Sequence, residues 1–398
     1  MIQPSYFSGE GAALKYIICC FSLLIVYFSP VIAAEKMDVY YGGVSFIGNF
    51  ADNKRLYEHS FALSEEKNAE GLPVLEQALL ARVKKINRDD INFVVGGLGN
   101  IDTGSAITLA FGVDWENISI ENIAGIYKIV VDLHAQILIF DYNSQKIIGS
   151  YPVALQVRDV SETEPSPELI RSIIRSLYLN DEYGMNIFET FAERLKEVPI
   201  QASFGQYLRV NNVILEEKSL PFIPTGNQGA FKTLVAQSFG KYLSTNQNVS
   251  LLPYTKGEAI GSKMALRFSN GDIFNLITPS SDYGIDLIIR GFKKVKAGEN
   301  HAKVSWVYGS YVRIKVEQPD TNKLYMDIPF VNAAVKEVPI SQSSVDDWSA
   351  YQESLFSFFD QFSREISKPS KKWLGKVTKV KNASKQLKAF NNILNKSR

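Results

Sequence analysis

The residues able to do acid–base, metal or nucleophilic chemistry are few and scattered. Three histidines occur, His59, His134 and His301, and none stands at a zinc-ligand spacing from carboxylates. No Gly-x-Ser-x-Gly nucleophile elbow is present. The two cysteines, Cys19 and Cys20, are adjacent and close to the amino terminus. The sequence therefore predicts no catalytic residue, no metal site and no cofactor.

Two glycine-rich stretches look like phosphate loops, but their spacing or context is wrong. In 226–233 the lysine does not directly follow a glycine, and after 96–99 no helix is expected to open. The acidic pair at 346–347 begins a predicted helix, where the helix dipole favours anions. We interpret these segments as loops and helix ends. A hydrolase acting on envelope polymers stays an alternative, and it would need acidic groups and histidine clustered in a cleft.

A stronger physical signal lies in the last 31 residues, 368–398. They hold ten Lys or Arg and no Asp or Glu, whereas the rest of the chain carries a formal net charge of −9. Apolar residues from Trp373 to Leu394 can share one side of a helix, which is typical of a basic amphipathic helix at an anionic lipid surface. Candidate contact residues are Lys371, Lys372, Trp373, Lys376, Lys379, Lys381, Lys385 and Lys388.

Several anionic partners would suit this tail. Anionic lipid, lipopolysaccharide phosphates, an acidic groove on an envelope protein or the acidic body of a second copy would all serve, the last giving a homo-oligomer. A disordered, solvated tail is the alternative. Nucleic acid is not expected, because the chain is predicted to be exported.

Export is predicted from the amino terminus. Lys15 precedes an apolar run at 16–28, and the segment 29–34 that follows ends in Ala33 and Ala34, the order of regions in a secretory signal peptide with cleavage after either alanine. The run is shorter than the roughly 20 residues that span a bilayer. Both cysteines fall inside it, so the mature chain would lack cysteine, which suits the bacterial periplasm. We expect a periplasmic or secreted protein. An uncleaved signal anchoring it to the inner membrane is the alternative.

The predicted helices and strands occur in the same order in both halves of the chain. In the first half we expect strands at 38–47, 91–95, 107–113, 126–142 and 146–158, a polar turn-like segment at 49–69, and helices at 72–86 and after 167. His134 is expected on a partly solvated face of its strand. In the second half we expect strands at 207–217, 249–252, 285–295, 305–316 and 324–331, a hairpin within an insertion at 254–281, and helices at 230–243 and 346–366.

The repeat is clearest at one turn in each half. Lys146 stands six residues before Pro152, and Lys323 stands six residues before Pro329. With 45% apolar and 21% charged residues, each half can bury a core. The predicted fold class is α+β, with two tandem modules, each a mostly antiparallel sheet with helices on one face, plus a basic C-terminal helix or tail. The predicted boundaries are 1–34 for the signal peptide, 35–200 and 201–367 for the modules, and 368–398 for the tail.

The second half resembles a known exported module. Asp286 to Phe292, Tyr311 to Val316 and the turn Asp320-Thr-Asn-Lys323 are similar to the α/β module of the curli-secretion-channel lipoproteins and of the TolB amino-terminal domain. The first half keeps only 110–112 and 143–146. The chain lacks the family's lipidated cysteine and obvious propeller repeats, so pore and propeller functions are not implied. The resemblance implies a non-enzymatic module that binds partner proteins.

The sequence thus favours an exported, non-catalytic cell-envelope scaffold or assembly protein. Its body would bind envelope proteins, and its basic tail would contact an anionic surface. A lipid- or glycolipid-binding protein, with an acyl chain held in a groove between the halves, is an alternative.

Overall fold

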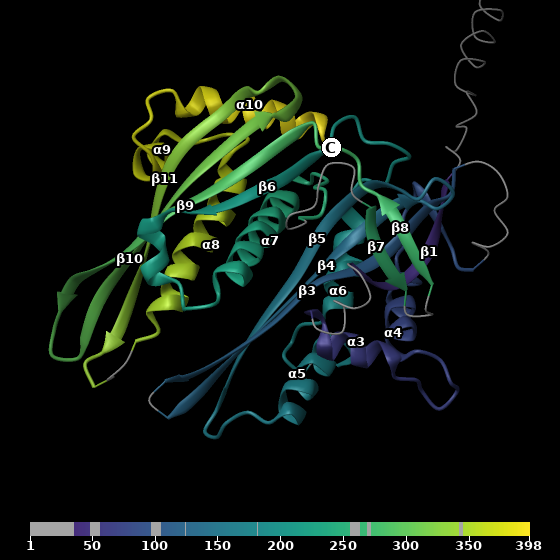
Figure 1. The fold of residues 1–398 in the computed structure, drawn as a ribbon, viewed down its shortest axis with the longest axis horizontal. Coiled ribbons are helices and arrows are strands. Elements are labelled where there is room, and N and C mark those ends of the chain that lie inside the picture. Colours follow the sequence, from purple (N-terminus) through teal and green to yellow (C-terminus); the bar gives the residue numbers. More distant parts are fainter. Residues whose placement is uncertain are drawn as a thin grey trace, which may run out of the picture.

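A computed structural model describes most of the chain after the predicted signal peptide (Figure 1). The described residues are 36–47, 56–96, 105–123, 125–180, 182–254, 263–268, 272–341 and 345–398. The signal-peptide prediction falls outside them. The residue boundaries of the predicted modules stay predictions, while the α+β class and the two-sheet architecture are confirmed.

The first sheet is built mainly from the first half of the chain and is covered on one face by four helices. Val131, Leu133 and Ala135 alternate toward these helices and are fully buried with them. The helices are α3 (Glu58–Glu65), α4 (Val74–Val83), α5 (Pro167–Leu179) and α6 (Ile187–Glu197). The strands, in sheet order, are β2 (Ile91–Val94), β1 (Met37–Ile47), β3 (Ile107–Ile123), β4 (Ile126–Asp141), β5 (Lys146–Ser161), β8 (Ile273–Ile277) and β7 (Lys263–Phe268).

The second sheet has four strands and buries one face under the helices of the second half. Its order is β11 (Lys323–Pro339), β10 (Lys303–Gln318), β9 (Tyr283–Glu299) and β6 (Leu208–Leu215). Its α-helices are α7 (Gln228–Gln247), α8 (Asp347–Glu365), α9 (Lys371–Val377) and α10 (Ala383–Lys396), and short 3₁₀ turns lie at η2 (Glu217–Phe222) and η3 (Pro319–Thr321). All four α-helices contribute to one apolar core with this sheet.

Strand pairing shows that the two halves repeat each other. In each, the first strand runs parallel to the first strand of an antiparallel three-stranded meander, β1 with β3 to β5 and β6 with β9 to β11. Each of the three strand pairs has an interruption at a corresponding position, and the β9–β10 pair has a second one at Ala297. Gly42 is unpaired between β1 and β3, and Asn211 between β6 and β9. Asp114 is unpaired between β3 and β4, and Arg290 between β9 and β10. Ile148 is unpaired between β4 and β5, and Tyr325 between β10 and β11.

The repeated turn before each lysine has the same backbone conformation. Gln145 and Asn322, which precede Lys146 and Lys323, have φ angles of 51° and 52°. Asparagine tolerates this left-handed region better than glutamine does. We therefore expect Gln145→Asn to raise the free energy of unfolding by roughly 0.5 kcal/mol, and Asn322→Gln to lower it by a similar amount. Urea unfolding would measure both, and shifts of the same sign would contradict a shared turn.

The hairpin β7–β8 belongs to the second half by sequence, but it pairs with the first sheet. Strand β7 pairs antiparallel with β1, and β8 contacts the end of β5 at Lys146 and Ile277. The six strands β1, β3, β4, β5, β8 and β7 therefore close on themselves. Leu138, Phe140, Leu266 and Leu276 fill the space that they enclose. The hairpin was predicted, but not its partner, because pairing across halves leaves no local pattern.

Three other predictions are corrected. Part of the segment 49–69 forms α3, where Phe61 and Leu63 face the first core, so the turn-like interpretation was wrong there. Residues 249–252 lie between the sheets rather than in a strand, with Leu251 N–H donating to the carbonyl of Ser150. His134 is buried rather than partly solvated. In each case burial by a distant part of the chain decided the local structure.

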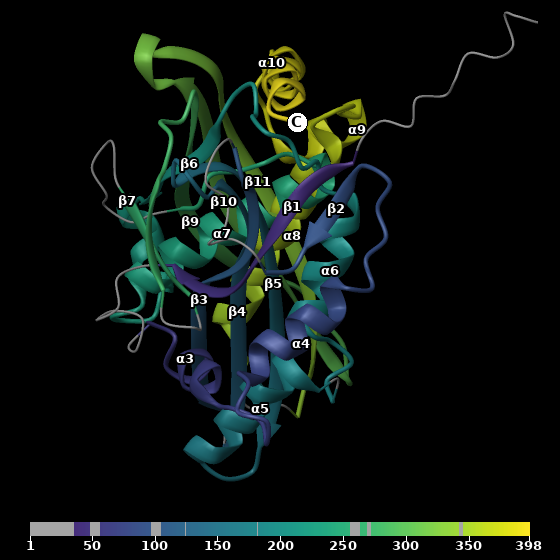
Figure 2. The same cartoon turned by 90° about the vertical axis from the view of Figure 1, so that its right-hand side faces the viewer.

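Helix α7 lies between the two sheets (Figures 1 and 2). It is buried nearly all round, which is typical of a helix packed on two sides. Phe231, Val235 and Phe239 join the second core, while Leu234 and Ser238 face the first sheet. The free face of the first sheet is therefore covered by a helix of the second half, and a seam runs between the two modules.

Candidate functional site

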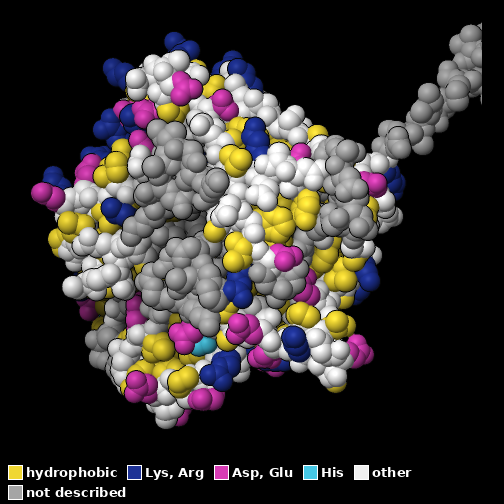
Figure 3. Space-filling view, turned by 45° about the vertical axis from the view of Figure 1, so that its right-hand side comes forward, with side chains coloured by type: hydrophobic (Ala, Val, Ile, Leu, Met, Phe, Trp, Pro, Cys, Tyr) yellow, Lys and Arg dark blue, Asp and Glu magenta, His cyan; other side chains and the backbone are white. Residues whose placement is uncertain are grey.

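The predicted contact lysines form an exposed surface on α9, α10 and the segment between them. We call it the basic surface, and it comprises Lys371, Lys372, Lys376, Lys379, Lys381, Lys385 and Lys388. All seven side chains are exposed. The two helices lie at one end of the molecule (Figures 1 and 2), and basic side chains gather along that end in the space-filling view (Figure 3).

The segment is folded onto the second sheet. Ser370 caps α9 by accepting a hydrogen bond from Trp373 N–H at 3.2 Å. The Thr378 hydroxyl donates to the carbonyl of Pro329, and the Gln386 side chain accepts from the Asp327 amide. Leu387 and Phe390 are fully buried in the second core. The alternative of a disordered tail is thus not what the structure shows.

Trp373 does not share the exposure of the lysines. Only 7% of its surface is exposed, and its ring lies 6.3 Å from that of Phe330 on β11. The apolar side of α9 and α10 faces the protein core, because the second sheet needs that cover. In this conformation Trp373 packs the core rather than facing solvent, and its contact role stays a prediction that the structure does not test.

The basic surface carries charge that the fold does not neutralise. None of its seven lysines forms an ion pair with any carboxylate of the described residues, and 368–398 itself contains no acidic residue. Some lysines elsewhere are paired, as Lys294 is with Asp347 at 2.6 Å. One sign of charge concentrated on a rigid surface produces a field that attracts anions.

A second candidate site is the groove between the modules. It consists of three hollows along the seam between the first sheet and α7 and α8. The outermost is lined by Asn117, Lys128 and Trp348, the middle one by Asp132, His134 and Lys241, and the largest by Pro152, Met185 and Arg194 among others. Asp132 and Leu234 line both the first and the middle hollow. Ala154 and Lys241 line both the middle hollow and the largest one, which has a volume of about 530 Å³. Neighbouring hollows of the groove therefore share lining side chains.

Burial disfavours the charged forms of three polar side chains in the middle of the groove. Burial raises the pKa of Asp132, although Gln156 and Asn117 donate hydrogen bonds to its carboxylate. Burial lowers the pKa of His134 to about 3, and its ring lies 5.3 Å from that of Trp115. Burial also lowers the pKa of the Lys241 ammonium, with the carboxylates of Asp132 and Asp360 opposing the shift.

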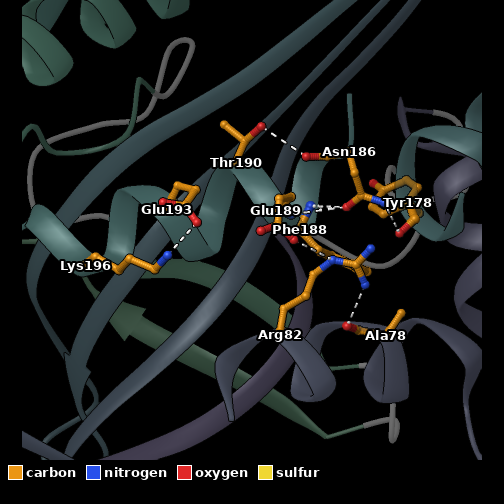
Figure 4. A network of polar contacts seen from close by, with 9 residues as sticks. All are labelled: Ala78, Arg82, Tyr178, Asn186, Phe188, Glu189, Thr190, Glu193 and Lys196. Atoms are coloured by element: carbon orange, nitrogen blue, oxygen red, sulfur yellow. Dashed lines mark hydrogen bonds and ion pairs between the residues drawn. The ribbon is translucent and has the colours of Figure 1, made fainter. Parts of the chain in front are cut away.

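Helix α6 forms one wall of the largest hollow, and polar contacts hold it in place (Figure 4). Asn186 caps the helix, since its side chain accepts from Phe188 and Glu189 amides at 2.9 and 3.1 Å and donates to the Tyr178 carbonyl. The rim glutamates are paired, Glu189 with Arg82 at 3.4 Å and Glu193 with Lys196 at 2.5 Å. The rim therefore carries little uncompensated negative charge.

A groove between the halves was predicted only as part of the lipid-binding alternative, and none of the residues that line it was assigned to it. Its signal was present in β4, where Asp132, His134 and Gln136 alternate with apolar residues of the core face. An alternating strand is ordinarily half solvated, and only the position of α7 shows that its polar face is covered. Among the described residues, no three His, Cys, Asp or Glu side chains are placed to hold a metal ion. Of the helices in the described part of the chain, none is both long and apolar enough to cross a bilayer.

Comparisons with known proteins identify no family for the chain. No family model matches, and no curated protein matches. Several solved structures show weak similarity, among them the following three. A hypothetical protein from Chlamydia trachomatis is 12% identical, with a TM-score of 0.25. The alignment covers 40% of this chain and 96% of that protein. A minor lipoprotein from Acinetobacter baumannii is 10% identical (TM-score 0.22; 41% of this chain, 92% of that one). A neuraminyllactose-binding hemagglutinin homolog from Helicobacter pylori is 12% identical (TM-score 0.26; 45% and 95%).

These descriptions name a lipoprotein and a hemagglutinin homolog, and none of the three names an enzyme. Similarity at this level assigns no function to the chain. None of them names the curli-secretion or TolB families, so that resemblance stays an expectation.

Proposed function

We propose that this protein is an exported, non-catalytic cell-envelope scaffold that attaches to an anionic surface through the basic surface of α9 and α10. One observation carries the proposal: seven exposed lysines, unpaired with any described carboxylate, stand on helices fixed to the core of the second module. An acidic body with a basic end would orient itself toward such a surface.

The attachment is electrostatic rather than inserted. Each cation near an anionic leaflet contributes about 1 kcal/mol, so several lysines acting together suffice for reversible binding. Because the apolar side of both helices is already buried, no hydrophobic anchor adds to this. Binding should weaken steeply as salt is raised, since exposed charges are screened.

We expect neutralisation of four lysines to abolish membrane attachment. Lys371→Gln, Lys372→Gln, Lys376→Gln and Lys379→Gln together should weaken binding to phosphatidylglycerol vesicles by about 10³-fold, at roughly 1 kcal/mol per charge. Co-sedimentation with vesicles at low salt measures this. The matched control neutralises four exposed lysines elsewhere, Lys84, Lys85, Lys146 and Lys293, and should bind like the wild type.

Deleting 368–398 would be a poor test, because the deletion removes Leu387 and Phe390 from the core. The fluorescence of Trp373 should also stay constant on binding. Equal sedimentation of the quadruple variant and its control would sink the proposal. Vesicles containing lipopolysaccharide, compared with phosphatidylglycerol alone, would show which anion is preferred.

The protein-partner part of the proposal is supported by the ends of the long hairpins, which project from both sheets (Figure 1). Exposed Ile120 and Ile126 lie at the end of β3–β4, and exposed Val295 and Val335 lie near the corresponding end of the second sheet. Exposed apolar side chains grouped in this way are typical of protein contacts. Cross-linking in intact envelopes from photoreactive residues at 120 and 335 would capture a partner or a second copy of this chain.

The hydrolase alternative would have to use Asp132 and His134, the acid and imidazole of the groove. Asp132 accepts hydrogen bonds from Gln156 at 2.6 Å and Asn117 at 3.3 Å, and His134 lies against an indole ring. The lipid-binding alternative is favoured by the groove itself.

A further inference from the structure

One ammonium group in the groove lacks a counter-charge. Lys241 lines both the middle and the largest hollow, yet within the described chain its Nζ makes no hydrogen bond or ion pair. Its nearest aromatic partner is the ring of Tyr242, 5.8 Å from Nζ. The carboxylates of Asp132 and Asp360 affect Lys241 only through longer-range attraction. A partly buried ammonium without a direct partner is costly, and an anion placed beside it would relieve that cost.

One side of the hollow next to this ammonium is apolar. Pro152, Val153 and Ala154 of β5 form one side of the 530 Å³ hollow, and Met185, 38% exposed, stands at the start of α6. The rest of the wall is polar and includes the charged residues Glu189, Glu193, Arg194, Glu197 and Lys241. A hollow of this size that combines an apolar wall with placed charges is typical of a small-molecule site.

The other charged side chains around the hollow have partners, so Lys241 is the charged group there that lacks an ion pair with any described residue. Glu189 and Glu193 are paired as described, and Glu197 lies 3.4 Å from the guanidinium of Arg194. Arg194 also donates to the Ser244 carbonyl at 2.8 Å, so it is partly committed to holding α6 against α7. Lys241 alone combines access to both hollows with an unpaired charge.

We propose that this groove binds a single-chain amphiphile with an anionic head, the head at Lys241 and the acyl chain against Pro152, Val153 and Met185. Each methylene removed from water contributes about 0.8 kcal/mol, so the chain supplies most of the affinity. The Lys241 contact supplies the preference for a charged head. A carboxylate and a phosphate monoester share the chemistry that Lys241 recognises.

The test uses the full mature chain and four probes below their micellar concentrations. The probes are oleate, oleoyl lysophosphatidate, oleoyl lysophosphatidylcholine and the uncharged glyceryl monooleate, competed against a fluorescent fatty acid. The wild type should bind oleate or lysophosphatidate roughly 10- to 100-fold more tightly than glyceryl monooleate. The Lys241→Met variant keeps the aliphatic stem and should lose this preference. The matched control, Lys232→Met on the same helix, should keep it.

The oleate and lysophosphatidate results distinguish a free fatty acid from a lysophospholipid as the preferred source. Tightest binding of lysophosphatidylcholine, equal binding of charged and uncharged probes by the wild type, or an unchanged preference in Lys241→Met would each overturn the proposal. So would an absence of binding to all four probes. Circular dichroism and thermal unfolding confirm that each variant is folded. The quadruple variant of the basic surface should bind the probes normally, so failure here and failure of vesicle attachment are separate results.

Discussion

A Leu266→Asp variant is expected to lose at least about 4 kcal/mol of its free energy of unfolding. Leu266 is fully buried within the closed strands, where β7 places it opposite Ile47 of β1. A carboxylate there would lack a counter-charge, and its desolvation adds to the lost apolar burial. Since small and medium domains have only about 5 to 15 kcal/mol in total, this change should leave much of the protein unfolded.

The hairpin offers a control on its other strand. Ile273 of β8 is 58% exposed, so Ile273→Asp should change the free energy of unfolding by less than about 1 kcal/mol. Urea unfolding followed by far-ultraviolet circular dichroism measures both variants. A Leu266→Asp protein as stable as Ile273→Asp would show that the hairpin does not close the first sheet.

Contacts between the two modules predict that they unfold together. The hairpin leaves the second half, completes the first sheet, and returns to β9. Arg194 of α6 and Lys128 of β4 make further contacts across the seam, to the Ser244 carbonyl and to Asp346. We therefore expect one cooperative transition in the wild type, with fluorescence and circular dichroism coinciding.

The sequence was most informative where structure is local. Lysine at a fixed distance before proline predicted equivalent turns, and the matching φ angles of Gln145 and Asn322 bear this out. Amphipathic periodicity likewise predicted α5, α6 and α8, because each covers a sheet with one apolar face. In these segments short-range pattern and final environment agree.

Prediction failed where a distant segment changes the environment. His134 lies in a strand with an ordinary alternating pattern, and only α7, about a hundred residues later in the chain, buries it. The lysines of the basic surface were correctly placed outside, but Trp373 was not, because amphipathicity does not say whether sheet or lipid receives the apolar face.

The corresponding β-bulges in the β3–β4 and β9–β10 pairs place their unpaired residues, Asp114 and Arg290, in different environments. Arg290 is exposed in the second module, with Glu216 at 3.9 Å. Its counterpart Asp114 has a carboxyl whose Oδ1 is buried without a hydrogen-bond partner among the described residues, while Oδ2 accepts from Gln136 at 2.6 Å. The Ser150 hydroxyl shares its one proton between the side-chain oxygen of Gln136 and the Leu251 carbonyl across the seam. The first bulge thus places an acid in the packed joint between the modules.

We expect Asp114→Asn to stabilise the protein above neutral pH. Burial raises the pKa of Asp114 to about 7, whereas the unfolded chain releases that proton near pH 4. Between these values the folded state binds more protons, so stability from this group is full at low pH and is lost as pH rises through the interval. The loss approaches about 4 kcal/mol, at roughly 1.4 kcal/mol per pH unit. Asparagine keeps an acceptor for Gln136 and does not ionise.

Subtracting the free energy of unfolding of the wild type from that of Asp114→Asn at each pH separates the effect of Asp114 from the titration of other groups. Lowering of the pKa of His134 to about 3 works in the opposite sense, because the unfolded state takes up the proton below pH 6.5 and stability falls with falling pH. His134 is present in both proteins, so its contribution cancels when the free energies are subtracted. Urea unfolding at intervals from pH 4 to pH 9 should show the advantage of Asp114→Asn growing from near zero to several kcal/mol. A difference that stays constant across this range would mean that the Asp114 carboxyl is solvated and ionised in the folded protein, with the joint between the modules open to water.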